Sequence, residues 1–212
     1  MTLAEILRLP GPFCRKHWVG VIVIVALIAS AAVYPSDLDQ YRATPYPGNE
    51  NALVVGVEAY GRHVNTAVAL AVPVLLRDWT GLKQLAVVAL SGVLATHIPK
   101  RLLNRIEIFG TRLGERPYSP DSRYNMPSGH SALASAVIWF LGRRYSWWFL
   151  LLMVPVTGLT MWARVMLNAH TVSAVIAGCL IGILVAMLFV TQRREHAQNG
   201  APTSDIGRGR AP

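Results

Sequence analysis

The chain has 212 residues, of which 53% are hydrophobic and only 15% are charged. A soluble domain usually carries about a quarter charged residues, so this composition argues against one and predicts a polytopic membrane protein with a single compact domain. The net charge of +9 does not predict a nucleic-acid partner, because the basic residues flank apolar segments, where they would contact anionic lipid headgroups.

Six apolar segments follow one another along the chain, and they predict an all-α fold in which six transmembrane helices form one bundle. These segments are residues 17–34, 52–76, 84–98, 128–142, 147–167 and 172–191. The second is the least regular, because Glu58, Arg62 and His63 precede its apolar part and Pro73 would kink it. We therefore expect it to begin at the membrane interface before it crosses.

Polar stretches separate some of these segments and end the chain. Residues 35–51 contain prolines and glycine that oppose regular structure. Residues 99–125 are rich in Arg, contain Lys100 and would form the longest polar loop of the membrane domain. Residues 196–212 are small and polar and predict a disordered cytoplasmic tail, which leaves residues 1–195 as the membrane-embedded domain.

The distribution of basic residues predicts the topology. Six spans place both termini on one side, together with most of the basic residues that flank the helices: Arg15, Lys16, Arg77, Lys83, Arg143, Arg144, Arg193 and Arg194. By the positive-inside rule this side is cytoplasmic, as in a bacterial inner-membrane protein. The Arg-rich loop and Arg164 would then face outward, against the rule. Binding of a multiply charged anion would explain this exception, and headgroup contact without chemistry is the alternative.

The outward-facing ends of the predicted helices carry groups suited to phosphate chemistry. The sequence PSGHS at residues 127–131 opens the fourth segment, so the backbone N–H groups of Ser128 and Gly129 and the helix dipole would face an anion. Arg116 and Arg164 offer paired donors that match phosphate oxygens, and Lys100 adds a point charge.

Two histidines, His130 and His170, would allow a two-step reaction at such a site. A neutral imidazole can attack phosphorus to form a phosphohistidine, while a second imidazole protonates the departing alkoxide and later activates water. Each histidine also has a simpler explanation: His130 could bond to a backbone carbonyl at a helix start, and His170 could lie at the interface at a helix end. The two together favour the catalytic interpretation.

The chain resembles the type 2 phosphatidic acid phosphatase superfamily of membrane phosphatases over about residues 82–190. The family's PSGH motif is intact at residues 127–130, and Arg164 and His170 have the spacing of its third motif. Arg116 and Pro117 match half of the first motif, which begins with a Lys. Six membrane spans are the usual architecture of this family.

The resemblance implies that His170 is the nucleophile and His130 the general acid. It also implies that the phosphate is held by Lys100, Arg116, Ser128, Gly129 and Arg164. No metal or cofactor is implied, in agreement with a sequence that lacks the clustered carboxylates and histidines of a metal pair.

The chain departs from the first motif at its Lys. The residue seven positions before Arg116 is Phe109, and Lys100 is the only lysine nearby. An insertion between Arg105 and Gly114 would restore the alignment of Lys100 with the motif.

The third motif also departs from the family pattern. Ala163 replaces a Ser, and Ala174 replaces the Asp that accepts the Nδ1–H of the nucleophilic imidazole in the family. Loss of such an orienting carboxylate costs about 10⁴-fold in rate in a Ser-His-Asp enzyme. The chain could be a weakened engineered variant, a natural binding relic, or an enzyme in which another group substitutes. The candidate substitutes are Ser173, Glu58 and Asp121. If the site lacks only a group that orients the imidazole of His170, Ala174→Asp should raise the rate of phosphate release.

The sequence therefore predicts an inner-membrane lipid phosphatase, metal-independent, with its site on the periplasmic side and both termini in the cytoplasm. The substrate classes that fit are undecaprenyl diphosphate, phosphatidylglycerophosphate, phosphatidic acid and the phosphates of lipid A. A lipid phosphotransferase that uses the same site, a non-catalytic lipid-phosphate binder and a transporter are the alternatives.

Overall fold

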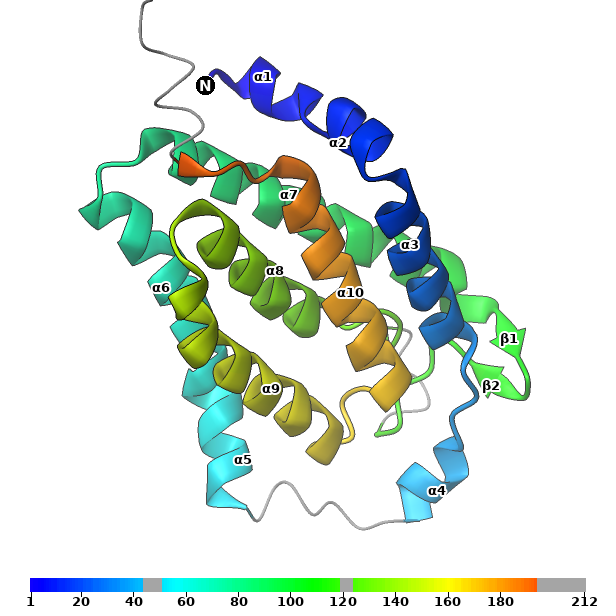
Figure 1. The fold of residues 1–212 in the computed structure, drawn as a ribbon. Helices are drawn as coiled ribbons and strands as arrows, with labels where there is room; N and C mark the ends of the chain where they lie inside the picture. Colours follow the sequence, from blue (N-terminus) through cyan, green and yellow to red (C-terminus); the bar gives the residue numbers. More distant parts are fainter. Residues whose placement is uncertain (44–50, 119–123, 194–212) are drawn as a thin grey trace, which may run out of the picture.

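The structure is a computed structural model that describes residues 1–43, 51–118 and 124–193, except the side chain of Arg62. Helices dominate the described residues, with one short hairpin (Figure 1). The helices are α1 Leu3–Arg8, α2 Pro10–Lys16, α3 Trp18–Val33, α4 Leu38–Ala43, α5 Ala52–Gly56, η1 Val57–Gly61, α6 Arg62–Leu75, α7 Trp79–Leu102, η2 Leu103–Arg105, α8 Gly129–Arg144, η3 Trp147–Phe149, α9 Leu150–Met166 and α10 Val172–Phe189. Strands β1 Glu107–Ile108 and β2 Thr111–Arg112 pair antiparallel.

All six predicted segments are helical, although their boundaries shift. The largest difference concerns α7, which continues through Pro99 to Leu102, so that Lys100 lies in the last turn of a helix and not in the polar loop. The turn survives Pro99 because the carbonyl of this proline still accepts the N–H of Leu103, even though proline itself donates no hydrogen bond. The predicted tail, residues 196–212, lies outside the described residues.

Among the described residues, three helical segments are long and apolar enough to cross a membrane, or four if the bent pair α1–α2 and α3 counts as one span. The three are 79–105, 147–166 and 172–189. The remaining predicted spans are helical but shorter or more polar, α6 with 14 residues and α8 with 16. The expected count of six spans and the outward orientation of the loop therefore remain predictions.

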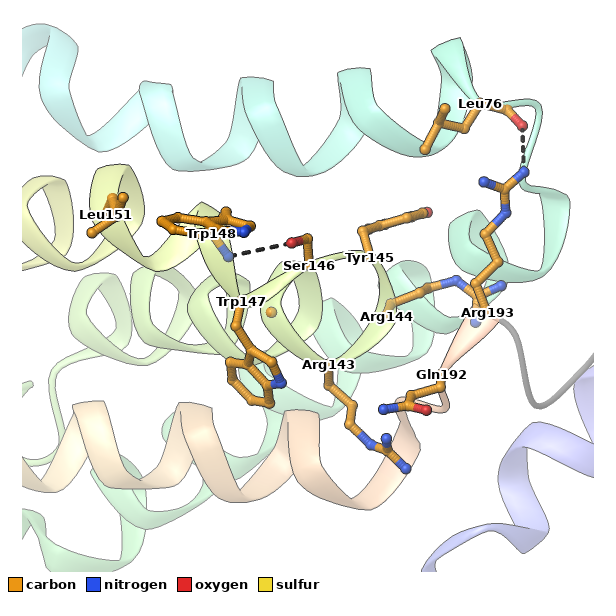
Figure 2. A pocket seen from close by; sticks show the side chains of 11 residues that line it. Leu76, Arg143, Arg144, Tyr145, Ser146, Trp147, Trp148, Leu151, Gln192 and Arg193 are labelled. Carbon is orange, nitrogen blue, oxygen red and sulfur yellow. Dashed lines mark hydrogen bonds between the residues drawn. The ribbon is translucent and has the colours of Figure 1, made fainter.

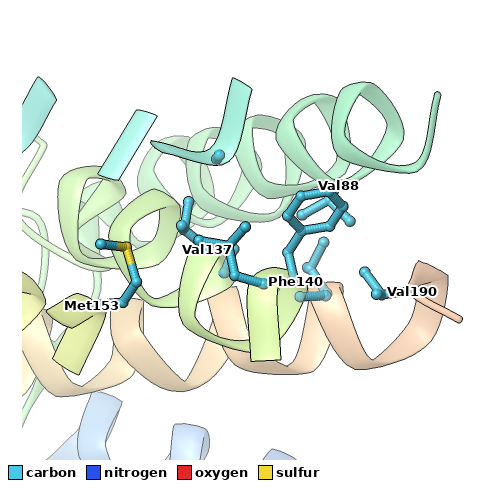
Figure 3. Packing of buried hydrophobic residues seen from close by; sticks show 10 residues of the cluster. Val88, Val137, Phe140, Met153 and Val190 are labelled. Carbon is cyan, nitrogen blue, oxygen red and sulfur yellow. The ribbon is translucent and has the colours of Figure 1, made fainter. Parts of the chain in front are cut away.

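Helix α8 occupies the centre of the bundle, with α6, α7, α9 and α10 packed around it, and α3 covers α10 from outside (Figure 1). The core lies between these helices around Phe140, Leu141 and Met153, whose side chains are fully buried (Figure 3). By contrast, no residue of α3 is buried by the bundle, which suits a helix whose outer surface contacts lipid.

The contact between α8 and α10 depends on small residues. A Cβ at Gly178 would overlap the carbonyl oxygen of Ser128, and a Cβ at Gly182 would overlap that of Ala132. The hydroxyl of Ser135 donates a 2.8 Å hydrogen bond to the carbonyl of Cys179 across the same contact. Small residues allow helix backbones to approach closely in membranes, where burial from water does not drive their association.

A buried ion pair lies at the end of the bundle where α7 begins and α8 ends. Arg144 donates from Nε and Nη2 to the two carboxylate oxygens of Asp78, at 2.6 Å each. Asp78 also accepts bonds from the Gly81 amide and the Tyr145 hydroxyl, and Arg144 Nη1 donates to Gln84 at 3.0 Å. Burial alone would raise the pKa of Asp78, but these hydrogen bonds outweigh burial and lower the pKa to about 2.

We predict that Asp78→Asn destabilises the fold, because it leaves the Arg144 guanidinium buried without its counter-charge. Breaking a buried pair in this way costs about 3–5 kcal/mol, which should lower the melting temperature in detergent by roughly 10 °C. Because the folded pKa is depressed, the wild type should also lose this stabilisation as the pH falls from the ordinary carboxyl pKa of 3.8 toward 2, and the variant should lack that loss. Asp39→Asn is the matched control, since the Asp39 side chain is 95% exposed. Equal melting temperatures for Asp78→Asn and the control would contradict the prediction.

Candidate active site

The predicted site residues lie at the end of the bundle opposite the Asp78–Arg144 pair. Lys100 is in the last turn of α7, Arg164 in the last turn of α9, and Ser128 is the N-cap of α8. His170 is in the loop between α9 and α10, and its backbone N–H donates to the carbonyl of Arg164 at 3.3 Å. Arg116 lies in the loop before α8, where its charge is felt by both Lys100 and His170.

His130 is at the second position of α8 and is partly exposed. It reaches the same end of the bundle as His170, because the Ser128 N–H donates to the carbonyl of Ala174, four residues after His170, at 2.9 Å. The structure therefore brings the start of α8, which carries His130, next to the start of α10, which follows His170.

The environment of His170 keeps its imidazole neutral. The side chain is buried, with a residue exposure of 1%, and burial lowers its pKa well below the usual 6.5. The positive charges of Arg164, Arg116 and Lys100 lower this pKa further. One hydrogen bond, to the backbone of Asn125, acts in the opposite direction and is outweighed.

That hydrogen bond also fixes the tautomer of His170. Its Nδ1 lies 2.8 Å from the carbonyl oxygen of Asn125. A carbonyl can only accept, so Nδ1 carries the proton and Nε2 keeps its lone pair. The Asn125 side chain in turn accepts from the Thr171 amide at 3.1 Å and donates to the Thr171 hydroxyl at 3.2 Å, which holds the loop that carries His170.

The backbone carbonyl of Asn125 thus accepts the Nδ1–H hydrogen bond that the missing carboxylate was expected to accept. Ala174 is fully buried and packs in an apolar cluster with Leu113, Met126 and Ala177. None of the substitutes expected from the sequence bonds to His170 Nδ1 within the described residues. Ser173 bonds to Ser36 and Thr171, Glu58 pairs with Arg164, and Asp121 lies outside the described residues.

The structure corrects one expectation about Ser128. Its backbone N–H already donates to the Ala174 carbonyl, so it is not available to an anion. Its side chain caps α8 by accepting from the Ser131 backbone N–H at 3.5 Å, and it also accepts from the Ser131 hydroxyl at 3.0 Å. The N–H group of Gly129 belongs to the first turn of α8, where a helix offers no intrahelical acceptor.

Lys100 lies beside this helix start. Its residue exposure is 7%, and a Cβ added to Gly129 would be 3.7 Å from its Nζ. Phe109, which holds the motif position by spacing alone, is 78% exposed at the turn of the β1–β2 hairpin. The hairpin lies within the interval where the sequence predicted an insertion, so the structure supports aligning Lys100 with the first motif.

The two arginines each carry a buried Nε. Among the described residues, no hydrogen-bond acceptor reaches the buried Nε of Arg116 or of Arg164. Arg164 Nη1 donates to Glu58 Oε1 at 2.6 Å, and this glutamate lies in the π-helical turn η1. A buried N–H without an acceptor is costly, so a site with two of them is suited to bind an oxyanion.

Asn125 was not expected at this site, and Glu58 was expected only as a possible substitute for the missing carboxylate beside His170. Asn125 acts through its backbone carbonyl, a group that every residue carries, so no sequence signal marks it. The pairing of Glu58 with Arg164 joins segments 106 positions apart. The sequence had indicated Glu58 as a possible partner of His170 and as an acidic residue inside an apolar segment, but it did not predict the pairing with Arg164.

Comparison with known proteins identifies the family of this chain. A family model described as the PAP2 superfamily matches residues 80–197. Lipid A 1-phosphatase of Helicobacter pylori strain 26695 is 41% identical over 137 residues, which are 65% of this chain and 71% of that protein. The protein of the same name from strain J99 is 42% identical over 136 residues, 64% of this chain and 70% of that one. No solved structure matches.

The family match spans more than half of the chain and contains Lys100, the PSGH motif, Arg164 and His170. It confirms the prediction of a membrane enzyme that hydrolyses lipid phosphates. The chain belongs to the PAP2 superfamily, the type 2 phosphatidic acid phosphatases.

Proposed function

We propose that this protein is an inner-membrane phosphatase that removes phosphate from a lipid A-type substrate through a phosphohistidine on His170. The observation that carries the mechanism is the buried, neutral His170, held by the Asn125 carbonyl beside three cationic side chains. The proposed substrate class is supported by the two relatives named lipid A 1-phosphatase, with which the chain shares 41% and 42% identity.

In the first step, Nε2 of His170 attacks the phosphorus atom of the substrate. The new N–P bond forms as the P–O bond to the lipid breaks, and protonated His130 gives its proton to the leaving oxygen. Lys100, Arg116 and Arg164 hold the phosphoryl oxygens, and the first N–H groups of α8 point at the same charge. In the second step, neutral His130 accepts a proton from water, the water oxygen bonds to phosphorus, and the N–P bond breaks to release inorganic phosphate.

The topology follows the distribution of basic residues. The candidate active site would face the periplasm and both termini the cytoplasm. A non-catalytic lipid-phosphate binder, which Ala174 favoured, loses its main support, because Asn125 gives His170 a partner that orients it for attack.

We predict that His170→Ala lowers phosphate release from lipid A in detergent by at least about 10³-fold, because no other group can form the covalent intermediate. His97→Ala is the matched control: this histidine is exposed on α7, its Nδ1 lies 3.1 Å from the Val93 carbonyl, and its loss should leave the rate unchanged. Activity that survives His170→Ala in a folded protein would exclude the mechanism. Faster release from phosphatidic acid than from lipid A would retain the mechanism and exclude the proposed substrate.

We predict that Ala174→Asp does not restore activity, contrary to the expectation from the sequence alone. The Asn125 carbonyl already accepts from Nδ1, and a carboxylate at position 174 would be buried against Leu113 and Met126. The rate of phosphate release should therefore stay equal to that of the wild type or fall, and the melting temperature should drop. Ala174→Val, which is apolar, separates the effect of size from that of charge. A rise in the rate of phosphate release of tenfold or more would show that His170 lacks an adequate orienting group in the wild type.

We predict that Glu58→Gln makes the enzyme more sensitive to vanadate and phosphate. The Glu58 carboxylate competes with the anion for Arg164. Its neutralisation should therefore lower the concentration of vanadate or phosphate that half-inhibits the enzyme by about tenfold. Tighter binding of the phosphate product should also lower kcat wherever product release limits the rate. Glu107→Gln, in the exposed hairpin, is the control. Weaker inhibition by vanadate would instead indicate that Glu58 serves only to position Arg164.

A further inference from the structure

A chain of hydroxyl groups connects the loop of His170 to the segment that follows α3. Asn125, whose backbone carbonyl accepts the His170 Nδ1–H, also donates from its side chain to the Thr171 hydroxyl at 3.2 Å. The Thr171 hydroxyl lies 2.9 Å from that of Ser173, which in turn lies 3.2 Å from that of Ser36. Thr171, Ser173 and Ser36 are called the hydroxyl chain below.

The direction of these hydrogen bonds follows from the capacity of a hydroxyl, which donates one proton and accepts two. Thr171 already accepts from the Asn125 side chain and, as the N-cap of α10, from the Ala174 N–H at 3.2 Å. Its own proton therefore goes to Ser173. Ser173 is buried and keeps its proton, for which Ser36 is the remaining acceptor within the described residues. All donors thus point from Asn125 toward Ser36, and bonds that run in one direction strengthen one another.

The far end of the hydroxyl chain is held by the rest of the fold. The Ser36 backbone N–H donates to the Thr111 hydroxyl at 2.9 Å, and that hydroxyl donates to the Ser36 carbonyl at 3.1 Å. Thr111 belongs to β2 and is buried. At the end of α3, Ala31 and Ala32 pack against the apolar cluster that contains Ala174. The hairpin and α3 therefore fix the position of Ser36 without the help of its own hydroxyl.

Such an anchor matters because the group that orients His170 is a backbone carbonyl. A carboxylate side chain can turn to follow an imidazole, whereas a carbonyl moves only with its main chain. On one side the Asn125 main chain is held by its N–H, which donates to the Gly114 carbonyl at 3.0 Å. On the other side it is held by the hydroxyl chain, through the Asn125 side chain. The carbonyl is thus fixed at the distance that His170 requires.

We propose that Ser173 and Ser36 are positioning residues for the imidazole of His170. They act through the Asn125 carbonyl and do not touch the substrate. The inference rests on the proposed function of His170 as the nucleophile. It extends the catalytic unit beyond residues 80–197, the part of the chain that matches the family, because Ser36 precedes them.

The first test measures phosphate release in detergent, with the lipid phosphate that the wild type hydrolyses fastest, so that the identity of the lipid does not decide the result. Ser173→Ala should lower kcat at least about tenfold, because a displaced carbonyl no longer holds Nε2 of His170 in line with phosphorus. KM and inhibition by inorganic phosphate should change less than about twofold, since the cations that hold the phosphate are untouched. Ser173→Thr keeps the hydroxyl and should retain most of the wild-type kcat.

A second measurement needs no turnover. In nitrogen-15 histidine NMR of the full chain, the Nδ1–H of His170 should exchange with water at least about tenfold faster in Ser173→Ala than in the wild type, because its acceptor is held less firmly. The result does not depend on which substrate the enzyme uses.

The hydroxyl chain also predicts how two substitutions combine. Ser36→Ala should lower kcat by about threefold, because it removes one hydrogen bond at the far end. The double variant Ser36→Ala/Ser173→Ala should be no slower than Ser173→Ala alone, because Ser36 acts through Ser173. Two residues that only stabilise the fold would instead give losses that multiply.

Two controls separate positioning from stability. Ser146 caps η3 at the opposite end of the bundle (Figure 2), and Ser146→Ala matches Ser36→Ala in chemistry and in partial burial. The buried hydroxyl of Thr157 in α9 accepts from Asn65 at 3.0 Å, so Thr157→Ala matches the buried substitution Ser173→Ala. Both controls should lower the melting temperature as much as their counterparts do and leave kcat unchanged.

Three results would overturn the proposal. Wild-type kcat and wild-type exchange of the Nδ1–H in Ser173→Ala would show that the hydroxyl chain does not position the ring, while His170→Ala would still decide the proposed function. An equal loss of kcat in Thr157→Ala would reduce the effect to stability. Losses that multiply in the double variant would show that Ser36 does not act through Ser173.

Discussion

Two glycines of α10, Gly178 and Gly182, let this helix approach α8 so closely that the Ser128 amide bonds to the Ala174 carbonyl at 2.9 Å. This contact connects the PSGH motif to the start of α10, and His170 lies four residues before the bonded carbonyl. Any side chain larger than hydrogen at either glycine would separate the two helices, since a Cβ there meets backbone, which cannot rotate away. The distance between the elements that carry the two histidines is therefore set by backbone packing and not by the histidines themselves.

The electrostatics of the site follow from its burial. Lys100 and Arg164 are less than a tenth exposed, and together with Arg116 they place three positive charges in a region with little water to screen them. Within the described residues, Glu58 is the carboxylate that bonds to one of these cations. Such a site favours an anion with more than one negative charge, because one charge alone would leave the repulsion between the cations incompletely balanced. Burial lowers the pKa of His170 most, and the same cations lower it further, so the groups that would bind the anion also help to keep the nucleophile neutral.

Much of this arrangement could be predicted from the sequence, because it depends on side-chain identity and on helical periodicity. The positions of the apolar helices, the helix start at Ser128 and the grouping of Arg116, Arg164 and His170 all belong to this class. Lys100 was harder to place, since the proline before it suggested the end of a helix that in fact continues to Leu102. The Asn125 carbonyl and the use of the Ser128 amide could not be foreseen, because backbone groups are the same at every position and only the tertiary fold decides which of them are paired.

The replacement of the family's Asp by Ala174 can be understood by separating what a carboxylate does beside a histidine. It accepts the Nδ1–H, which fixes the ring, and it supplies a negative charge, which stabilises the imidazole when bonding to phosphorus makes it cationic. In this chain the Asn125 carbonyl performs the first role at 2.8 Å but is neutral. Within the described residues, the carboxylate that pairs with a cation of this site is Glu58, which bonds to the Arg164 side chain and not to His170. A charge on Glu58 is farther from the ring than a carboxylate on Nδ1 would be, so it stabilises the cationic ring less strongly, but it offsets the cation whose charge lowers the pKa of His170 most.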